Sequence, residues 1–153
     1  GLEVASNLPL HEGGVTLYEG GIRVPCIVRW PGKIKPATVC REPVVHVDFL
    51  PTSLHAAGVT LPNDRVIDGQ DATEVLAGKG RSAHKSFCWV WERWQAVRDG
   101  NYKLVRNGKE NPWELYDLSK DLSEKNDLAL PEPKLVAKLE RQFERWLAEV
   151  HSN

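Results

Sequence analysis

The sequence has no excess of charge of either sign. Its 153 residues carry 20 basic and 21 acidic side chains, which gives a formal net charge of −1. A field strong enough to gather nucleic acid or an anionic membrane surface requires a large excess of one sign. Nucleic-acid binding and membrane-surface binding are therefore disfavoured as functions, and we predict neither partner.

Cysteine is also scarce. Cys26, Cys40 and Cys88 are far apart and odd in number. Such a set fits neither a disulfide framework nor a zinc site with paired ligands. We expect all three to be small apolar residues of the interior.

Long hydrophobic runs are missing too. No stretch approaches the roughly 18 uninterrupted apolar residues of a membrane span, and the start GLEVASNLPL lacks the features of a signal peptide. Any export signal would lie on sequence outside these residues. What is present is the composition of an ordinary globular domain, 41% hydrophobic and 27% charged, which is long enough to bury a core.

The first part of the sequence predicts one strand and one helix. The stretch GGVTLYEGGIRVP is rich in glycine, and Gly20 and Gly21 predict a tight bend before the apolar run IRVPCIVRW. This run is rich in β-branched residues and predicts a buried strand over 22–30. The segment VVHVDFLPTSLHAAGV has apolar residues three and four apart and ends at Gly58, which predicts a helix over about 46–58.

The second part predicts a small antiparallel sheet. Residues 63–85 predict a surface connection with one short helix at about 72–77. Large apolar and polar residues then alternate on both sides of Asp99-Gly100, and a second turn precedes WELYDL, so we expect about four strands in a meander. Apolar residues at helical spacing over 133–150 predict an amphipathic helix packed on this sheet.

Five segments together resemble a known family. TLYEGGIRVPCIVRWPGKI, HVDFLPTSLHAAGV, DGQDATEVLAG, AVRDGNYKLV and WELYDLSKDLSEKNDLA follow one another in the order and at the spacing seen in the C-terminal part of type I sulfatases. The pattern is most similar to the arylsulfatase and N-acetylgalactosamine-sulfatase branch.

The resemblance implies a fold related to alkaline phosphatase. We therefore predict an α/β (α+β) chain, in which residues 1–62 are a remnant of the core, with the last strand and helix of a mixed sheet. Residues 63–85 are the connecting loop. Residues 86–153 form the small antiparallel sheet with its C-terminal amphipathic helix.

The resemblance also implies a reaction, the hydrolysis of a sulfate ester by a formylglycine with the help of calcium. In the family the formylglycine arises from Cys/Ser-x-Pro-x-Arg, and none of the three cysteines is followed by proline two residues later. The family's calcium ligands would fall upstream of Gly1. We predict no catalytic residue, no metal ligand and no cofactor on this chain, and we expect it to be inactive alone. Family members are often exported to the periplasm or the lysosome, and the compartment of this chain stays open.

One family active-site element should fall inside the chain. Family members commonly carry a lysine that contacts the sulfate five residues before the glutamate that matches Glu19, and Gly14 stands at that position here. Glycine cannot replace an ammonium group, so Gly14 receives no catalytic role. We interpret the neighbouring glycines as the bend into the strand, with Glu19 capping backbone amides. Direct ligand binding by this stretch is the less favoured alternative.

Aromatic and basic residues of the predicted sheet suggest a substrate surface. Trp91 and Arg93, together with Trp89 and Trp94, would form an aromatic, cationic wall for a sugar sulfate, since the family's C-terminal sheet borders the substrate cleft. Alternation equally predicts the core face of a strand, which we favour. Arg98 and Lys103 are predicted to face solvent.

The histidines of the predicted helix raise the question of a metal or acid–base site. His46, Asp48 and His55 lie on that helix, but residues two apart point to different faces. We favour structural roles for them.

Two functional hypotheses remain. In the first, the chain is the C-terminal part of a sulfuric ester hydrolase, and its partners are the missing N-terminal part and a sulfated ester or glycan. In the second, it is a non-catalytic, sulfatase-derived module that binds a sulfated glycan or a second copy of itself, which Gly14 slightly favours. In either case we expect strand 22–30 to pair with a second copy or to be covered by rearranged N-terminal residues.

Overall fold

The computed structural model describes residues 6–152, which form two compact units. The first, which we call the sheet unit, contains the described residues up to Pro25 together with those from Ser86 onward. The second, the helix unit, contains Cys26–Lys85. This division differs from the predicted boundaries, because the residues before Cys26 group with the C-terminal sheet.

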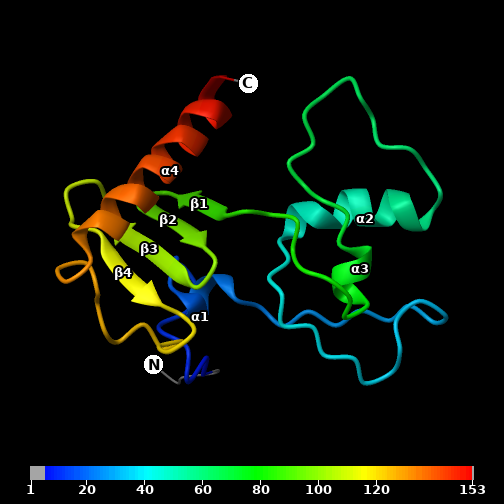
Figure 1. Cartoon of the computed structure of the whole chain (residues 1–153), viewed down its shortest axis with the longest axis horizontal. Helices are drawn as coiled ribbons and strands as arrows, with labels where there is room; N and C mark the ends of the chain where they lie inside the picture. Colours follow the sequence, from blue (N-terminus) through cyan, green and yellow to red (C-terminus); the bar gives the residue numbers. More distant parts are fainter. Residues whose placement is uncertain (1–5, 153) are drawn as a thin grey trace. The chain divides into compact units, whose positions relative to one another are not determined.

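The sheet unit contains a four-stranded antiparallel meander in the order β1-β2-β3-β4 (Figure 1). The strands are β1 (Phe87–Trp91), β2 (Trp94–Asp99), β3 (Tyr102–Asn107) and β4 (Glu114–Asp117). The β2–β3 hairpin turns through Gly100, whose φ of 59° is in the region that glycine favours. The predicted meander and its Asp99-Gly100 turn are confirmed.

Both faces of this sheet are covered. Helix α4 (Pro133–Ser152) packs on one face, where Leu139 and Phe143 are fully buried against alternate residues of the strands. The N-terminal segment covers the other face, where Leu17 and Tyr18 join the remaining alternate residues in a second apolar cluster. The side chains of that second cluster are Leu17, Tyr18, Ala96, Val105, Tyr116 and Leu118. The predicted helix 133–150 and its packing on the sheet are confirmed.

The helix unit contains η1 (His46–Asp48), α2 (Phe49–Ala56) and α3 (Thr73–Leu76). Gly58 has a φ of 68° and its N–H bonds to the carbonyl of His55, while the N–H of Val59 bonds to the carbonyl of Leu54. This pair of bonds is the Schellman motif that ends many helices at glycine. The helix predicted at about 46–58 and the short helix at about 72–77 are confirmed.

The predicted strand over 22–30 is wrong for the chain as the structure describes it. The short helix α1 (Glu19–Ile22) occupies its start, and residues 23–30 form neither helix nor strand. A strand needs a neighbour for its backbone N–H and C=O groups, and the four strands of the described residues all belong to the small sheet. Val24 and Ile27 are consequently 75% and 96% exposed.

The three cysteines are free, and they are less buried than expected. Cys26 is exposed because it lies in the segment that formed no strand, so its predicted burial is wrong. Cys40 and Cys88 are half-buried. Burial raises the pKa of the Cys88 thiol to about 12, which keeps it protonated and unreactive.

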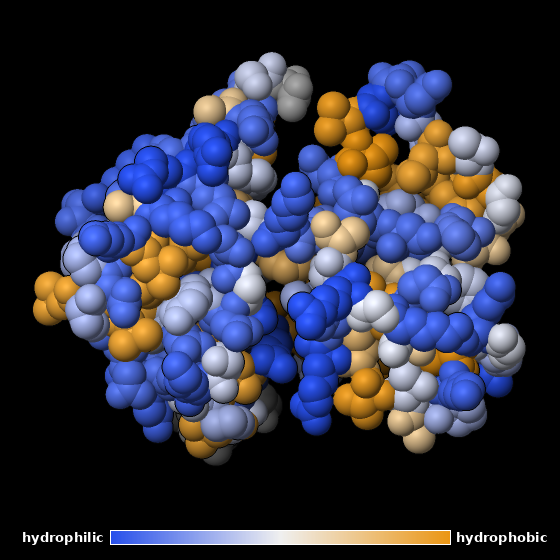
Figure 2. Space-filling view, in the orientation of Figure 1, coloured by the Kyte–Doolittle hydropathy of each residue, from blue (hydrophilic) through white to orange (hydrophobic). Residues whose placement is uncertain are grey.

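Apolar side chains reach the surface of the helix unit. Figure 2 shows them among the hydrophilic side chains of this unit. Those at least 42% exposed are Ile27, Val39, Phe49, Leu50, Val59, Leu61 and Val66. Within residues 6–152, no helix has the length and apolar character that crossing a membrane requires.

Candidate functional site

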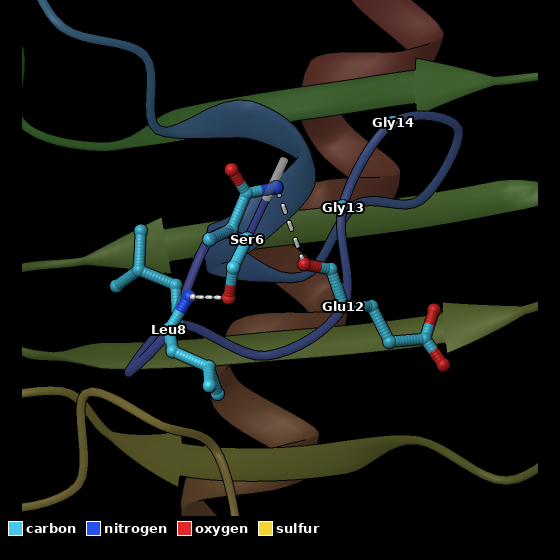
Figure 3. A pocket seen from close by; sticks show the side chains of 7 residues that line it. Ser6, Leu8, Glu12, Gly13 and Gly14 are labelled. Atoms are coloured by element: carbon cyan, nitrogen blue, oxygen red, sulfur yellow. Dashed lines mark hydrogen bonds between the residues drawn. The ribbon is translucent and has the colours of Figure 1, made fainter. Parts of the chain in front are cut away.

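The glycine-rich loop before α1 is held in place by backbone carbonyls and one amide side chain. The Asn7 side chain donates to the carbonyl oxygen of Gly20 at 3.1 Å. It also donates to the carbonyl oxygen of Glu12 at 3.4 Å, and a dashed line marks this second bond in Figure 3. The Gly20 N–H donates to the carbonyl of His11 at 2.9 Å. A Cβ at Gly20 would overlap the carbonyl oxygens of His11 and Glu12. Gly20 is therefore required by close approach of the backbone, and the loop is tied directly to α1.

Gly14 lies in this loop and lines an open cavity of about 420 Å³ that residues 6–8, 10 and 12–14 surround. In Figure 3, Gly13 and Gly14 lie in the bend of the loop above the sheet, and the Glu12 carboxylate points away from Ser6 and Leu8. Gly14 has a φ of 46°, and no atom lies within 4 Å of the place where a Cβ would stand. A side chain at position 14 would therefore extend into open space. Any residue other than glycine would, however, have to adopt the unfavourable left-handed backbone conformation.

Below the loop, a buried lysine joins three parts of the sheet unit. Lys103 of β3 is fully buried, and its Nζ lies 2.9 Å from Oε1 of Glu19 and 2.9 Å from Oε1 of Glu124. The other oxygen of Glu124, Oε2, accepts the backbone N–H of Glu19 at 2.6 Å. We call Glu19, Lys103 and Glu124 the buried charge cluster. It fixes α1 and the chain after β4 to the same strand.

The buried charge cluster corrects two predictions. Lys103 was expected to face solvent, because one face of a small antiparallel sheet is commonly exposed. The N-terminal segment covers that face, so Lys103 is buried. Glu19 was expected to cap backbone amides, but its carboxylate binds the Lys103 ammonium, and Glu124 accepts the amide instead.

The cluster holds two carboxylates around one fully buried ammonium. Burial raises the pKa of Glu124 above its ordinary value, and the nearby Glu19 carboxylate adds to this, although Lys103 opposes it. Arg23 lies 3.7 Å from Glu19, but its side chain is half exposed and compensates weakly.

An aromatic group extends the same face. The His11 ring stacks on the Tyr18 ring with centroids 4.1 Å apart. The hydroxyls of Tyr18 and Tyr116 both donate to Oε2 of Glu114, at 2.7 and 2.6 Å. Burial and this hydrogen bond raise the pKa of both tyrosines, so both phenols stay protonated donors.

The residues proposed for substrate binding lie at the end of the β1–β2 hairpin. Trp91 ends β1 and is 41% exposed, while Arg93 lies in the following turn and forms an exposed ion pair with Glu110. Trp89 and Trp94 are half-buried and pack against the apolar cluster of Tyr18. Of the four residues of the proposed wall, only Trp91 and Arg93 are left open to solvent. Arg98 bonds through its Nε to the carbonyl of Gly100.

In the helix unit, Asp48 is the hub of a polar network. Its carboxylate accepts the backbone N–H groups of Val45 at 3.0 Å and Gln70 at 2.8 Å, and its Oδ1 lies 2.6 Å from Nε2 of His84. The partner of Asp48 is thus His84, which the sequence analysis did not single out because it lies 36 residues away. Asp48 joins three segments of the helix unit.

His55 has a separate partner. Its Nδ1 lies 2.7 Å from Oδ2 of Asp71, at the surface of the helix unit. Burial opposes ionisation of Asp71, but hydrogen bonds from Thr73 and the His55 charge outweigh it, so the pKa of Asp71 is lowered. Asp48 and His55 thus have structural partners, and among the described residues the His46 side chain forms neither a hydrogen bond nor an ion pair with Asp48.

Several solved structures share this fold. The crystal structure of Ps i-CgsB in complex with k-i-k-neocarrahexaose matches 93% of this chain and 32% of that chain, with a TM-score of 0.81 and 25% identity. The structure of a 2-O GAG sulfatase matches 67% of this chain and 24% of that one, with a TM-score of 0.55 and 26% identity.

Relatives in sequence are sulfatases as well. An uncharacterized sulfatase of Schizosaccharomyces pombe is 38% identical over 152 residues, which covers 90% of this chain and 26% of the yeast protein. Mouse steryl-sulfatase is 46% identical over 102 residues, 65% of this chain and 16% of the mouse protein. Dog N-acetylgalactosamine-6-sulfatase is 37% identical over 109 residues, 71% of this chain and 21% of the dog protein.

Fold and relatives together define a C-terminal sulfatase portion, which confirms the resemblance carried by the five segments. The chain belongs to the family described as N-sulphoglucosamine sulphohydrolase, C-terminal, which matches residues 15–153. It spans about a quarter or less of the length of the yeast, mouse and dog relatives.

The described residues do not fit the cofactors that the family implies. A calcium ion takes six to eight oxygen ligands, and residues 6–152 hold no group of three or more His, Cys, Asp or Glu side chains placed for a metal. The Asp48 carboxylate is already taken by Val45, Gln70 and His84. The described residues therefore offer no site at which calcium would be held.

Proposed function

We propose that this chain is the C-terminal part of a sulfuric ester hydrolase of the arylsulfatase type, inactive alone, whose nucleophile and metal ligands are supplied by an N-terminal part. The observation that carries the proposal is the family match over residues 15–153, which includes the segment from Thr16 to Gly21. The yeast and mouse relatives are about four and six times as long as the region that matches, and this leaves ample chain for the missing chemistry.

In this proposal the glycine-rich loop forms one wall of the sulfate pocket. Support comes from the open cavity at Gly14 and from the anchoring of the loop to α1. The chain itself offers no cation at Gly14, so the positive charge that stabilises the sulfate would come from the N-terminal part. Such stabilisation is usually the largest single contribution to catalysis.

Trp91 and Arg93 are proposed to contact the organic part of the substrate. An exposed indole offers a flat apolar face for a sugar ring. The Arg93 guanidinium is held by Glu110 in a solvent-exposed pair, and such a pair is worth at most about 1 kcal/mol. A sulfated sugar could therefore displace Glu110 at small cost.

The N-terminal part is also proposed to cover residues 23–30. These residues carry exposed apolar side chains and have no strand partner within the described chain. Adding an extended segment to the edge of another sheet satisfies its backbone groups and buries such side chains. The predicted strand would then form only in the assembled protein.

A chimera tests the proposal. The matched C-terminal region of the sulfatase of Formosa agariphila, which is 32% identical to this chain over 165 residues, is replaced by this chain. We expect the chimera to hydrolyse 4-nitrophenyl sulfate in the presence of calcium and the isolated chain to show no turnover. Turnover by the isolated chain, or a folded but inactive chimera, would contradict the proposal.

Gly14→Lys in the chimera sharpens the test. Because Gly14 stands at the place of the family's sulfate lysine, the added ammonium should raise kcat by as much as about 100-fold. Gly14→Gln carries the same left-handed backbone strain without the charge and serves as the control. Equal activities of the two variants would show that Gly14 does not line the sulfate pocket.

A second candidate function is a non-catalytic module that binds a sulfated glycan or itself. The absence of a lysine at Gly14 and the exposure of Val24 and Ile27 favour it. Light scattering on the purified chain tests self-association, for which a dimer is expected. A monodisperse monomer with freely exchanging amides over 23–30 would argue against it, and a Cys-x-Pro-x-Arg motif upstream would favour the enzyme.

A further inference from the structure

The helix unit contains a cavity that the sequence analysis did not consider. It has a volume of about 580 Å³ and is bounded by residues 32–36 on one side and by Ala77–Lys79, which follow α3, on the other. Figure 1 shows the turn of the first segment running below α3. The volume is in the range of sites that hold small ligands.

Local hydrogen bonds fix both walls of this cavity. The N–H groups of Lys33 and Ile34 both donate to the carbonyl of Trp30, and the Thr38 hydroxyl donates to the carbonyl of Lys35 at 2.8 Å. On the other wall, the Gly78 N–H donates to the carbonyl of Val75 at 2.9 Å. Both walls are therefore formed before any ligand arrives.

Gly78 allows the two walls to come close together. Its φ is 74°, and a Cβ there would stand 3.0 Å from Cγ2 of Thr38. Such a distance is too short for an ordinary contact, so any other residue would push the walls apart or strain the backbone. Glycine at this position therefore suits the left-handed backbone and leaves room for the Thr38 methyl group.

Three of the lining residues are lysines, Lys33, Lys35 and Lys79. Lysines of the sheet unit such as Lys103, Lys120 and Lys138 are each paired with a carboxylate. Among the described residues, the three cavity lysines form no such pair, and the lining contains no acidic side chain. Three like charges on one small surface without a counter-ion produce a positive potential.

We infer that this cavity, which we call the lysine cavity, binds the sulfate groups of a polysulfated glycan. A lysine ammonium is a compact point charge that suits a sulfate oxygen without demanding one orientation. A glycan that carries several sulfates can engage the three lysines together, and linked contacts of this kind strengthen one another. The choice of ligand class rests on the proposed function.

The inference is tested by calorimetric titration of the full chain with dextran sulfate. Carboxymethyl dextran of equal charge density and neutral dextran are the comparison ligands. The triple variant K33Q/K35Q/K79Q is expected to bind dextran sulfate about tenfold more weakly than the wild type. The control K109Q/K125Q/K134Q loses the same charge at exposed lysines of the sheet unit and is expected to keep its affinity within about twofold.

Amide chemical shifts locate the site. Shifts on adding dextran sulfate are expected over residues 32–38 and 77–79. Equal weakening in both triple variants, or equal affinity for carboxymethyl dextran, would overturn the inference. The titration requires no turnover, so an inactive chimera would contradict the proposed function and leave this result unaffected.

Discussion

The two units of the chain differ in what they bury. In the sheet unit, Val97, Leu104 and Phe143 are at zero exposure on one face of the sheet, and the buried charge cluster lies on the other face. In the helix unit, Asp48 and Thr52 are buried and hydrogen-bonded, while Phe49, Leu50 and Val66 face outward. A unit whose apolar side chains point outward around a polar network is suited to being covered by other chain. Both apolar clusters of buried side chains therefore belong to the sheet unit, and the helix unit leaves more of its large apolar side chains exposed.

Removing the ammonium group of Lys103, which is fully buried in the sheet unit, should have the largest effect. Lys103→Met leaves Glu19 and Glu124 buried without their ammonium, and breaking a buried pair in this way costs about 4 kcal/mol. Urea unfolding followed by tryptophan fluorescence measures the loss. Lys138→Met, which breaks the partly exposed pair with Asp99, is the matched control and should cost below about 1 kcal/mol.

A rescue distinguishes charge from packing at this position. Adding Glu19→Gln and Glu124→Gln to Lys103→Met removes the unpaired charges, and we expect most of the lost stability to return. No recovery would mean that Lys103 acts by its volume alone.

Truncating one apolar side chain in each unit tests whether the two units differ in the burial of their apolar side chains. Leu139→Ala opens a cavity between α4 and the sheet and should cost about 3 kcal/mol. Phe49→Ala removes a side chain that is half exposed and should cost below about 1 kcal/mol in the isolated chain. A larger cost for Phe49 would mean that the isolated helix unit has a core of its own.

Two glycines of the same loop should respond differently. Gly20→Ala forces a methyl group against the carbonyls of His11 and Glu12 and should cost about 2 kcal/mol. Gly14→Ala places its methyl group in open space, so only the left-handed backbone conformation lowers the stability, by about 1 kcal/mol. Thermal unfolding of the two variants measures the difference, and the reverse order would show that the loop is not held against α1.

The smallest expected effect is the pH dependence of the buried charge cluster. The pKa of Glu124 is higher in the folded chain than its ordinary value, so folding takes up a proton. Stability therefore falls as pH rises from the ordinary pKa of Glu124 through its folded pKa. Glu124→Gln should lack this slope in urea unfolding at a series of pH values, with Glu132→Gln as the control for loss of one charge. Parallel curves for wild type and Glu124→Gln would contradict the assignment.

Local patterns were sufficient for the elements of the sheet unit. Asp99-Gly100 between alternating residues specifies a hairpin, and the apolar spacing over 133–150 specifies a helix, because both signals act over a few residues. In the helix unit, Gly58 likewise marked the end of α2. In each case the residues that decide the structure are neighbours in the sequence.

Long-range partners were the part that the sequence did not reveal. The run 22–30 has the pattern of a buried strand. A local pattern does not indicate which strand it pairs with, and the described residues contain no partner strand for it. Lys103 was misplaced because cover for its face comes from residues more than 80 positions earlier. A signal was available, since Lys103 shares its face with the apolar Val105 and lies opposite Tyr116. For the pair of Asp48 and His84, no local pattern exists.

The described residues up to Ile22 pack only when the rest of the sheet unit has formed. Tyr18 bonds to a residue 96 positions later, and the amide of Glu19 to one 105 positions later. During synthesis from the N-terminus, Leu17 and Tyr18 leave the ribosome long before the strands that will shelter them exist. Contacts between residues so far apart in sequence form more slowly than local ones. The helix unit, in which the bond from Ser82 to Glu42 spans 40 residues, needs shorter loops, so we expect it to fold before the N-terminal segment packs.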